Sequence, residues 1–477
     1  MKNLFVAVLT GLLMVNMSGC IDANTAKTVV YPPLPGLVTS PDFKVNVNGQ
    51  DVWTEKVGVG GYERTVRPPE GYDRADSELF TPDHMEDLNI ANFSCSGKQN
   101  ITITVSEDIQ NYIIHPKSKH IVAKVKGNEM TFNIDAPQHL YIEINNLPHL
   151  AIFANPLEEN VPSQSAQDVV FFGPGVHNVG EIQLQSNQTI YIAGGAVVNA
   201  NVRGVDLENV KILGRGCLNG NLRINTSKNF EVNGIFMRST RGWTNTITDC
   251  YKTVYDNVKV FSYRAIYSLD GINPVSCKNA VINNCFIRTR DDCIAIKTPA
   301  WVENSRTDSI SVTKCLLVGW MPADGITLGF ELQVGDTKNV FVRDCDIVRA
   351  RGGGRTGGHS AFSIVCDGPS KVSDIYFENI RVAADIDPKN LEIIITDGSL
   401  YGEGGTGNIN GVYLKDIYWE NNNKPFVIKG QQSQLIENIT FENCYVGGKL
   451  LTKPEDADFQ IEFVKDINFI PGGKFNP

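Results

Sequence analysis

Apolar and polar residues follow one recurring phrase from about residue 187 to the end of the chain. Two alternating apolar residues precede a polar pair that often contains Asn or Asp, and an apolar-any-apolar triplet follows, as in residues 254–260, 282–287 and 342–347. Alternation with a period of two is typical of strands, so each copy predicts two short strands joined at a polar corner. The central apolar residues of the copies lie 23 to 37 residues apart at Ile235, Val258, Cys285, Cys315, Cys345, Ile380, Ile417, Cys444 and Ile467.

Repeats of this length indicate a solenoid or an array. The copies lack the Leu ladder of a leucine-rich repeat and the four strands per unit of a propeller, whereas short strands, Asn-rich corners and coils of variable length are typical of a right-handed parallel β-helix. The repeat predicts such a domain over residues 168–477, with entry coils near residues 190 and 210. Successive coils should stack about 4.8 Å apart.

Residues 37–167 lack the repeat but contain other alternating segments, at 43–47, 101–105, 121–125 and 140–144, separated by Gly, Pro or Asn turns. Such segments predict an antiparallel β-sandwich. A polar stretch with two prolines, residues 156–167, predicts the boundary. The expected fold is therefore all-β, with an N-terminal β-sandwich followed by a right-handed parallel β-helix.

The first twenty residues have the pattern of an export signal, with Lys2 before a short apolar run. The run ends at Met17-Ser18-Gly19-Cys20, which resembles the bacterial lipoprotein cleavage box. This resemblance implies a signal peptide over residues 1–20, lipidation of Cys20, a tether over residues 21–36 and a place in the cell envelope. An ordinary secretory peptide is the alternative. No later run reaches the ~20 apolar residues of a membrane span, so membrane contact is expected only through the lipid.

Composition narrows the choice of partners and cofactors. The chain has 43 Lys and Arg against 53 Asp and Glu, a net charge of −10, which argues against nucleic-acid binding because phosphates require a basic face. Four of the ten cysteines after Cys20 occupy the central position of the repeat and are expected as buried thiols. The chain has no C-x-x-C pair for zinc, and we expect neither a metal nor a cofactor.

Four aspartates, Asp270, Asp291, Asp292 and Asp324, follow the central residues of consecutive copies. We expect them on one flank of the solenoid, about one coil apart. Carboxylates stacked in this way repel, so at least one should have a raised pKa and stay protonated near neutrality. Inverting glycoside hydrolysis uses one protonated and one ionised carboxyl group. Asp291 and Asp292 can both face a substrate only at a bend, because neighbouring residues of a strand point to opposite faces.

The residues Asp270-Gly271 and Asp291-Asp292-Cys293, with their spacing, resemble the motifs of the polygalacturonases, glycoside hydrolase family 28. They also resemble the three-aspartate site of the family 49 dextranases and isopullulanase, which combine the β-helix with an N-terminal β-sandwich. The resemblance implies an exported polysaccharide hydrolase that works by inversion. Asp291 would be the general acid, and Asp270 and Asp292 would hold the attacking water.

Two departures from the family 28 pattern bear on the substrate. Ala323-Asp324-Gly325 stands where the family has Gly-His-Gly, and Phe362-Ser363-Ile364 stands at the Arg-Ile-Lys motif that grips a uronate. Without that ion partner an anionic sugar would lose several kcal/mol, which favours a neutral glycan as the substrate. Other basic residues could supply the missing charge, namely Arg288, Arg290, Lys297, Arg349, Arg351 and Arg355. Residues expected to contact the substrate are Asp324, Lys297, His359, Arg290 and Trp320.

Two other functions fit the same scaffold. A polysaccharide lyase would use carboxylate-bound Ca²⁺ with an Arg or Lys base. A non-catalytic glycan-binding surface protein would use the elongated face of the solenoid. A polysaccharide is the expected partner in all three cases.

Overall fold

The structure, a computed structural model, describes residues 26–57, 87–239, 242–262, 268–320, 323–351, 359–402 and 404–473. Within these ranges the chain is strands and loops, apart from two short 3₁₀ turns, η3 (Lys117–Lys119) and η4 (Pro454–Asp456). These ranges contain no helix of the length and apolarity that a membrane crossing needs. The signal peptide and Cys20 lie outside the described residues.

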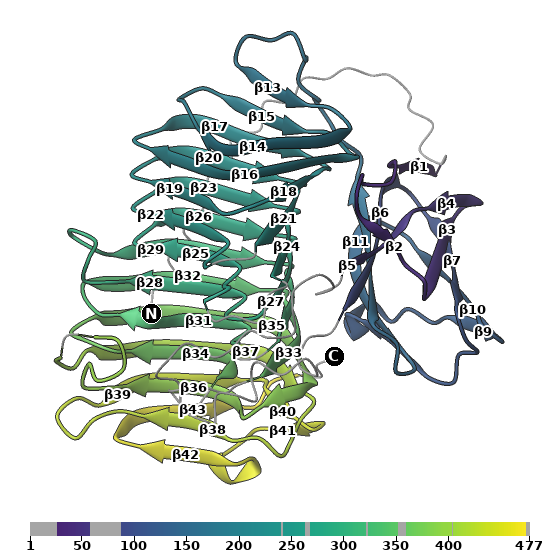
Figure 1. Cartoon of the computed structure of the whole chain (residues 1–477). Coiled ribbons are helices and arrows are strands. Elements are labelled where there is room, and N and C mark those ends of the chain that lie inside the picture. The colour runs from purple at the N-terminus through teal and green to yellow at the C-terminus, as the bar shows by residue number, and fades with distance from the viewer. Residues whose placement is uncertain are drawn as a thin grey trace, which may run out of the picture.

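The C-terminal part is a right-handed parallel β-helix in which 31 described strands form one continuous ladder, as the repeat predicted (Figure 1). Each coil contributes one strand to each of three faces, which we name A, B and C. Face A contains β13 (Val169–Phe172), β15 (Thr189–Ile192), β17 (Glu208–Gly214), β20 (Lys228–Asn233), β23 (Tyr251–Asp256), β26 (Lys278–Asn283), β29 (Thr307–Thr313), β32 (Asp336–Arg343), β35 (Lys371–Asp387), β37 (Asn408–Trp419), β39 (Ile436–Glu442) and β43 (Val464–Ile470).

Face B contains β14 (Gly175–Gln183), β16 (Ala196–Val205), β18 (Cys217–Asn219), β21 (Phe236–Ser239), β24 (Lys259–Ser262), β27 (Phe286–Thr289), β30 (Leu316–Gly319), β33 (Asp346–Arg351), the second halves of β35 and β37, and β40 (Tyr445–Val446) with its hairpin partner β41 (Lys449–Leu450). Face C begins with the second halves of β14 and β16 and continues through β19 (Leu222–Asn225), β22 (Asn245–Thr248), β25 (Ile272–Val275), β28 (Ile294–Thr298), β31 (Ile326–Leu332), β34 (Ser360–Cys366), β36 (Lys389–Ile395), β38 (Phe426–Lys429) and β42 (Phe459–Glu462).

The polar corner of the repeat lies between faces A and B and is a left-handed bend. Asn257, Asn284 and Asp344 have φ angles of 53°, 49° and 55°, a region that Asn and Asp adopt more readily than most residues. The apolar residue that follows each bend turns into the core, and Val258 and Cys285 are fully buried. The repeat therefore combines a corner that needs Asn or Asp with a core position that needs a small apolar side chain.

The cysteines fill this core. All ten cysteines after Cys20 are free thiols and all are buried. The prediction of core thiols is confirmed.

The N-terminal sandwich consists of two sheets within the described residues. The first contains β1 (Lys27–Val30), β2 (Val38–Thr39), β5 (Thr54–Val57), β6 (Leu88–Ser96), β8 (Tyr112–His115), β11 (Gln138–Ile144) and β12 (His149–Pro156), and the second contains β3 (Phe43–Val47), β4 (Gln50–Val52), β7 (Gln99–Val105), β9 (Lys124–Lys126) and β10 (Glu129–Ile134). Residues 27–30 were expected in a tether. They instead pair antiparallel with β6, because Thr28 and Val29 find backbone partners at the edge of that sheet.

The sandwich packs on face B through an apolar seam (Figure 1). Phe153 of β12 is fully buried, and its ring lies 5.6, 6.0 and 5.0 Å from the rings of Phe236, Phe261 and Phe286 on three successive coils. Rings at these separations gain dispersion and quadrupole energy beyond the area they bury. The seam fixes the sandwich along the solenoid and leaves the turns between faces B and C for other contacts.

Candidate active site

The candidate residues lie in the turns between faces B and C, which we name the B–C turns. Face C aligns one register position of five successive coils, occupied by Asn245, Ile272, Ile294, Ile326 and Phe362. Two residues before that position stand, in order, Trp243, Asp270, Asp292, Asp324 and Ser360. Three carboxyl groups therefore occupy one structural position on consecutive coils, about 4.8 Å apart along the axis. The backbone ladder continues through them, since Gly271 N–H donates to the Asp292 carbonyl at 2.9 Å and Cys293 N–H to the Asp324 carbonyl at 3.0 Å.

Asp291 lies beside this column, in the bend between β27 and β28. Its Oδ2 accepts a 2.7 Å hydrogen bond from the Ser268 N–H of the preceding coil, and its Oδ1 accepts a 3.0 Å bond from the Asp292 N–H. The bend allows both neighbouring aspartates to reach the same turn, which an extended strand would forbid. Burial and the charge of Asp292 raise the pKa of Asp291 to about 7, although His359 opposes that shift. Asp291 is also the more exposed of the two aspartates.

Asp270 is buried beside a lysine that it shares with another carboxylate. The Lys297 ammonium lies 3.6 Å from Asp270 Oδ2 and 2.6 Å from Glu331 Oε2, and it stands 4.3 Å over the Trp243 ring. Burial raises the pKa of Asp270 well above its ordinary value, although the ammonium opposes the shift. Burial, followed by the charges of Asp324 and Asp270, raises the pKa of Asp292 in the same direction. The column therefore holds more protons near neutrality than isolated aspartates would.

Asp324 was expected to contact substrate, but its carboxylate is fully enclosed. Its Oδ1 accepts the Ser360 N–H at 2.5 Å and its Oδ2 accepts the Ser363 hydroxyl at 2.6 Å. His359 Nδ1 lies 3.5 Å from Asp324 and 3.8 Å from Asp292 Oδ1. Burial alone would lower the pKa of His359, but the charges of Asp324 and Asp292 raise it to about 9. Asp324 therefore lies enclosed beside a protonated imidazole that also faces Asp292.

The remaining predicted contacts flank the column. Arg290 is buried, and its backbone N–H donates to Ser262 Oγ at 2.7 Å. Trp320 follows β30 on the next coil, and the Arg349 guanidinium lies 4.1 Å over its ring. One face of the indole is therefore already covered. Lys297 and His359 each lie within 4 Å of a carboxylate of the column.

Residues 160–457 match the family model of glycosyl hydrolases family 28, more than half of the chain. The chain belongs to this family. The matched region includes the whole aspartate column, and the resemblance read from Asp270-Gly271 and Asp291-Asp292-Cys293 is confirmed at the level of the family. The match places the chain among the glycosyl hydrolases of family 28.

Individual relatives of this family 28 hydrolase are distant in sequence. A probable polygalacturonase of Arabidopsis thaliana is 26% identical over 167 residues, which are 31% of this chain and 34% of the plant protein. The match thus spans about a third of that protein's length. Dex49A from Penicillium minioluteum superposes with a TM-score of 0.64 at 15% identity and covers 92% of this chain and 96% of its own. A hyperthermoactive exopolygalacturonase from Thermotoga maritima superposes with a TM-score of 0.52 at 16% identity and covers 63% of this chain and 84% of its own.

These two structures share the fold of the present chain. Coverage of 92% by Dex49A includes most of the sandwich as well as the solenoid, whereas 63% is about the share of the solenoid alone.

Sequence reasoning missed three residues that complete the surroundings of the column. Glu331 of β31 binds Lys297, and Phe330 stacks edge-on against His359 with ring centroids 5.6 Å apart. Tyr401, half exposed, has its ring 6.1 Å from Phe330, and the charge of Asp291 contributes to its raised pKa after burial. Only coil stacking brings these residues together, so no local motif could have indicated them.

Tyr401 is held in place by the buried carboxylate of Asp367. Asp367 Oδ2 accepts the Tyr401 N–H at 2.5 Å and the Gly402 N–H at 2.7 Å, and its Oδ1 accepts the Thr396 hydroxyl. Gln333 adds a 2.6 Å hydrogen bond to the Tyr401 carbonyl. The loop that carries this aromatic ring is therefore fixed by several polar contacts.

One group of residues in the described chain has metal-ligand spacing, since Asp292, Asp324 and His359 offer atoms within 4.8 Å of one another. Both Asp324 oxygens already accept hydrogen bonds, and Asp292 Oδ1 accepts the Asp324 N–H at 2.9 Å. A raised pKa keeps His359 protonated near neutrality, and an imidazolium has no lone pair for a metal. The group is better described as an internal hydrogen-bond network than as a cation site.

Proposed function

We propose that this protein hydrolyses a polysaccharide with inversion, with Asp291 as general acid and Asp270 and Asp292 as the groups that hold the attacking water. The observation that carries the proposal is the position and pKa of Asp291. Its carboxyl group is partly exposed, lies beside two stacked carboxyl groups, and has a pKa of about 7, which suits a proton donor near neutrality.

In the proposed reaction, Asp291 protonates the glycosidic oxygen as the bond to the anomeric carbon breaks. Water held by Asp270 and Asp292 attacks that carbon from the opposite side and gives up a proton to the ionised member of the pair. Lys297 lies 3.6 Å from Asp270 and favours its ionised form. The protonated His359 does the same for Asp292 from 3.8 Å. Two cations thus keep one carboxylate available as base despite burial.

A neutral sugar at the cleaved bond fits the surrounding side chains. Phe362, Ser363 and Ile364 are fully buried, and the Ser363 hydroxyl donates to Asp324 at 2.6 Å. The Lys297 ammonium is already paired with Glu331 and Asp270, and the His359 imidazolium is paired with Asp324. A carboxylate bound directly at the reacting sugar would therefore lack an unpaired basic partner in the described part of the site.

A panel of pectic, α-glucan and galactan polysaccharides tests the proposal. We expect the wild type to release reducing ends from at least one, and Asp291→Asn to lower that rate by about 10²–10⁴-fold with an unchanged melting temperature. Asp336→Asn, an exposed aspartate of β32, is the matched control and should retain full activity. Near-normal turnover by Asp291→Asn would remove the acid assignment, and early-time NMR that finds a retained anomer would remove inversion.

The same panel separates the alternatives. A product that absorbs in the ultraviolet and disappears with chelator would identify a lyase. Glycan binding without release of reducing ends from any substrate would identify a binding protein.

We also propose that the protein is exported and attached to the bacterial envelope through a lipid on Cys20. The Met17-Ser18-Gly19-Cys20 sequence after a short apolar run supports this proposal. Cells that express the protein with radiolabelled palmitate should incorporate label, and Cys20→Ala should abolish incorporation and release the protein from the membrane fraction. Equal labelling of both proteins would contradict the lipid anchor.

A further inference from the structure

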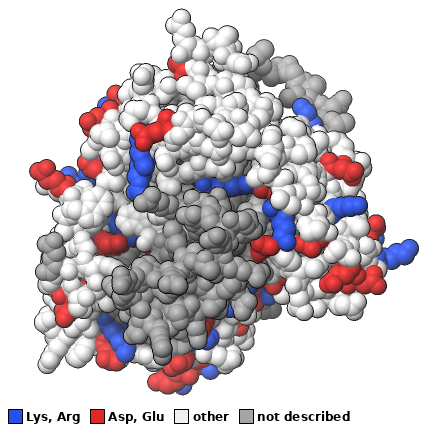
Figure 2. All heavy atoms as spheres, in the orientation of Figure 1, with Lys and Arg blue, Asp and Glu red and all other residues white. Residues whose placement is uncertain are grey.

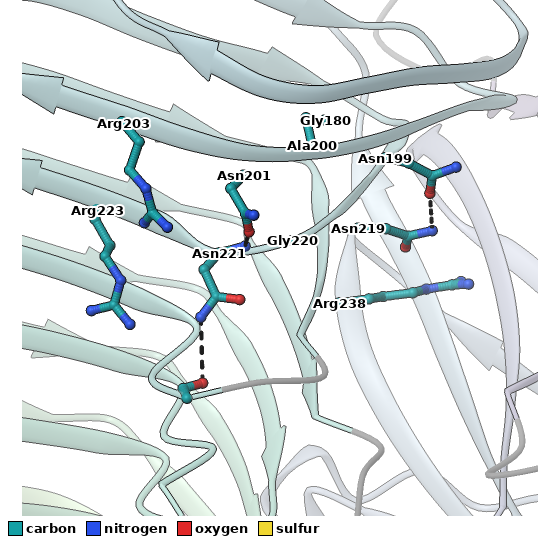
Figure 3. A pocket seen from close by; sticks show the side chains of 11 residues that line it. Gly180, Asn199, Ala200, Asn201, Arg203, Asn219, Gly220, Asn221, Arg223 and Arg238 are labelled. Atoms are coloured by element: carbon teal, nitrogen blue, oxygen red, sulfur yellow. Dashed lines mark hydrogen bonds between the residues drawn. The ribbon is translucent and has the colours of Figure 1, made fainter. Parts of the chain in front are cut away.

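A groove of about 580 Å³ opens in the B–C turns of the first coils, on the same flank as the aspartates (Figure 3). Polar side chains from three coils line it, among them Asn201, Arg203, Asn221 and Arg223. Its floor depends on Gly220, which has a φ of +153° and whose Cβ, if present, would lie 2.0 Å from the Ala200 carbonyl oxygen. A side chain at that position would clash with the floor, so the glycine keeps the groove open.

The two arginines of the groove are stacked on neighbouring coils. Arg203 and Arg223 are register partners on face C, and both point outward in Figure 3 with their guanidinium groups on the same side. Burial and the neighbouring charge of Arg203 lower the pKa of Arg223. Two like charges in this position repel, and an anion between them would relieve the repulsion.

Neither arginine is neutralised by the described parts of the chain. The Nη1 atom of Arg203 is buried without a hydrogen-bond partner there, and Arg223 makes one long bond, 3.4 Å, to Thr246 Oγ1. No carboxylate in those ranges lies within ion-pair distance of either guanidinium. By contrast, Arg238, which also lines the groove, is fully buried against Glu55 at 2.6 Å. Both guanidinium groups are half-buried, and their unmade donor contacts are available to a ligand in the groove.

A chain of contacts links the groove to the aspartate column. Asn201 Oδ1 accepts the Asn221 N–H at 3.1 Å, and the Asn221 amide donates to the Trp243 carbonyl at 2.7 Å. The Trp243 ring in turn contacts Lys297, the partner of Asp270. Arg223 stands two coils before Asp270 and Arg203 three coils before it, which is about 10 and 14 Å along the axis. These separations are about the length of two to three sugar units.

We propose that Arg203 and Arg223 form a subsite for an anionic group of the polysaccharide, a uronate carboxylate or a sulfate ester, several sugar units from the cleaved bond. This inference rests on the proposed function and adds to it, since the reacting sugar is neutral and a distant sugar carries the charge. Guanidinium groups bind planar oxyanions through paired N–H donors, and the two stacked arginines offer several such donors. The neighbouring Asn side chains suit the hydroxyls of the same sugar.

Calorimetric titration of the full-length Asp291→Asn protein tests the subsite without hydrolysis of the probe. The probes are a galacturonate hexamer, its carboxyl-reduced neutral form and a sulfated galactose hexamer. We expect at least one anionic probe to bind at least about tenfold more tightly than the neutral one, with an affinity that falls as salt increases. Arg203→Gln with Arg223→Gln should remove this preference and leave affinity for the neutral probe unchanged.

A charge-matched control, Arg306→Gln with Lys98→Gln, removes two exposed positive charges elsewhere and should keep the preference. Preference for galacturonate alone assigns the subsite to uronates, and preference for the sulfated probe assigns it to sulfate esters. Equal binding of all three probes, or equal loss in the control, would overturn the subsite. An arginine-dependent preference in a wild type that cleaves no polysaccharide would support the subsite and refute the proposed hydrolysis.

Discussion

The substitution His359→Gln tests the electrostatics of the site most directly, because it removes one positive charge and keeps a polar side chain. The imidazole lies 3.5 Å from Asp324 and 3.8 Å from Asp292, and its pKa of about 9 keeps it protonated near neutrality. Its charge also lowers the pKa of Asp291, which stands at about 7 with the imidazolium present. Without that charge, the pKa of Asp291 should rise.

The sign of the effect follows from the role of Asp291. A general acid is active when protonated, so kcat/KM should fall about tenfold per pH unit above the pKa of Asp291. A unit charge at about 4–6 Å, in an effective dielectric of about 20, contributes about 3–4 kcal/mol, and about 1.4 kcal/mol is one pKa unit. The alkaline limb of the variant should therefore move upward by at least about one pH unit. The acid limb should move upward too, because Asp292 loses the same stabilising charge.

Initial rates at low substrate concentration, measured across both limbs, give the two apparent pKa values of kcat/KM. His177→Gln provides the control, since His177 belongs to β14, on an early coil, and binds the Gly173 carbonyl. Its profile should match the wild type. An alkaline limb of His359→Gln that stays in place or moves to lower pH would refute the charge assignment.

Three further outcomes are expected. Asp367→Ala should raise KM several-fold with little change in kcat, because Tyr401 loses its fixed position. Asp397→Ala, at an exposed position in the same loop, should leave both constants unchanged. An unchanged KM for Asp367→Ala would show that Tyr401 does not contact substrate. Phe153→Ala should lower the free energy of unfolding, measured with guanidinium chloride, by about 3–5 kcal/mol. Ile470→Ala, at an exposed position, should change it by less than about 0.5 kcal/mol. Similar values for both variants would contradict the buried seam. In a Cys20→Ser protein, a thiol reagent such as DTNB should label no cysteine in the native state and ten in denaturant, so rapid native labelling would contradict the buried core thiols.

The period-two alternation and the Asn-rich corners were sufficient to predict the solenoid, because each coil repeats the same demand for a left-handed bend and a small core residue. They predicted the two strands that flank each polar corner, and the structure adds a third strand to each coil. The third strand, on face C, follows B–C turns of variable length, so its position has no fixed spacing from Val258 or Cys285. The alignment of the aspartates therefore emerged only from the strand register.

Charged side chains were harder to interpret from sequence. Asp324 was expected to contact the substrate, but it is enclosed, and it accepts hydrogen bonds from one backbone amide and one hydroxyl group of the next coil. Lys259 is fully buried, and its ammonium donates to the Gly234 and Asn257 carbonyls under the sandwich. Surface charges of both signs are interspersed on the face drawn in Figure 2, so net charge alone says little about where a charged ligand binds. Burial and pairing depend on contacts between residues far apart in the chain, which composition cannot supply.

The stacking of coils has a consequence for how such hydrolases diversify. Equivalent positions on adjacent coils are about 4.8 Å apart, which is close to the reach of a histidine side chain. A functional group can therefore arise one coil earlier or later in the sequence and still occupy nearly the same place in the site. The imidazole beside Asp292 arises one coil after the position at which the resemblance to family 28 expects it. Divergence in this fold is therefore better followed down the columns of the solenoid than along linear motifs, and a lost motif residue need not mean a lost function.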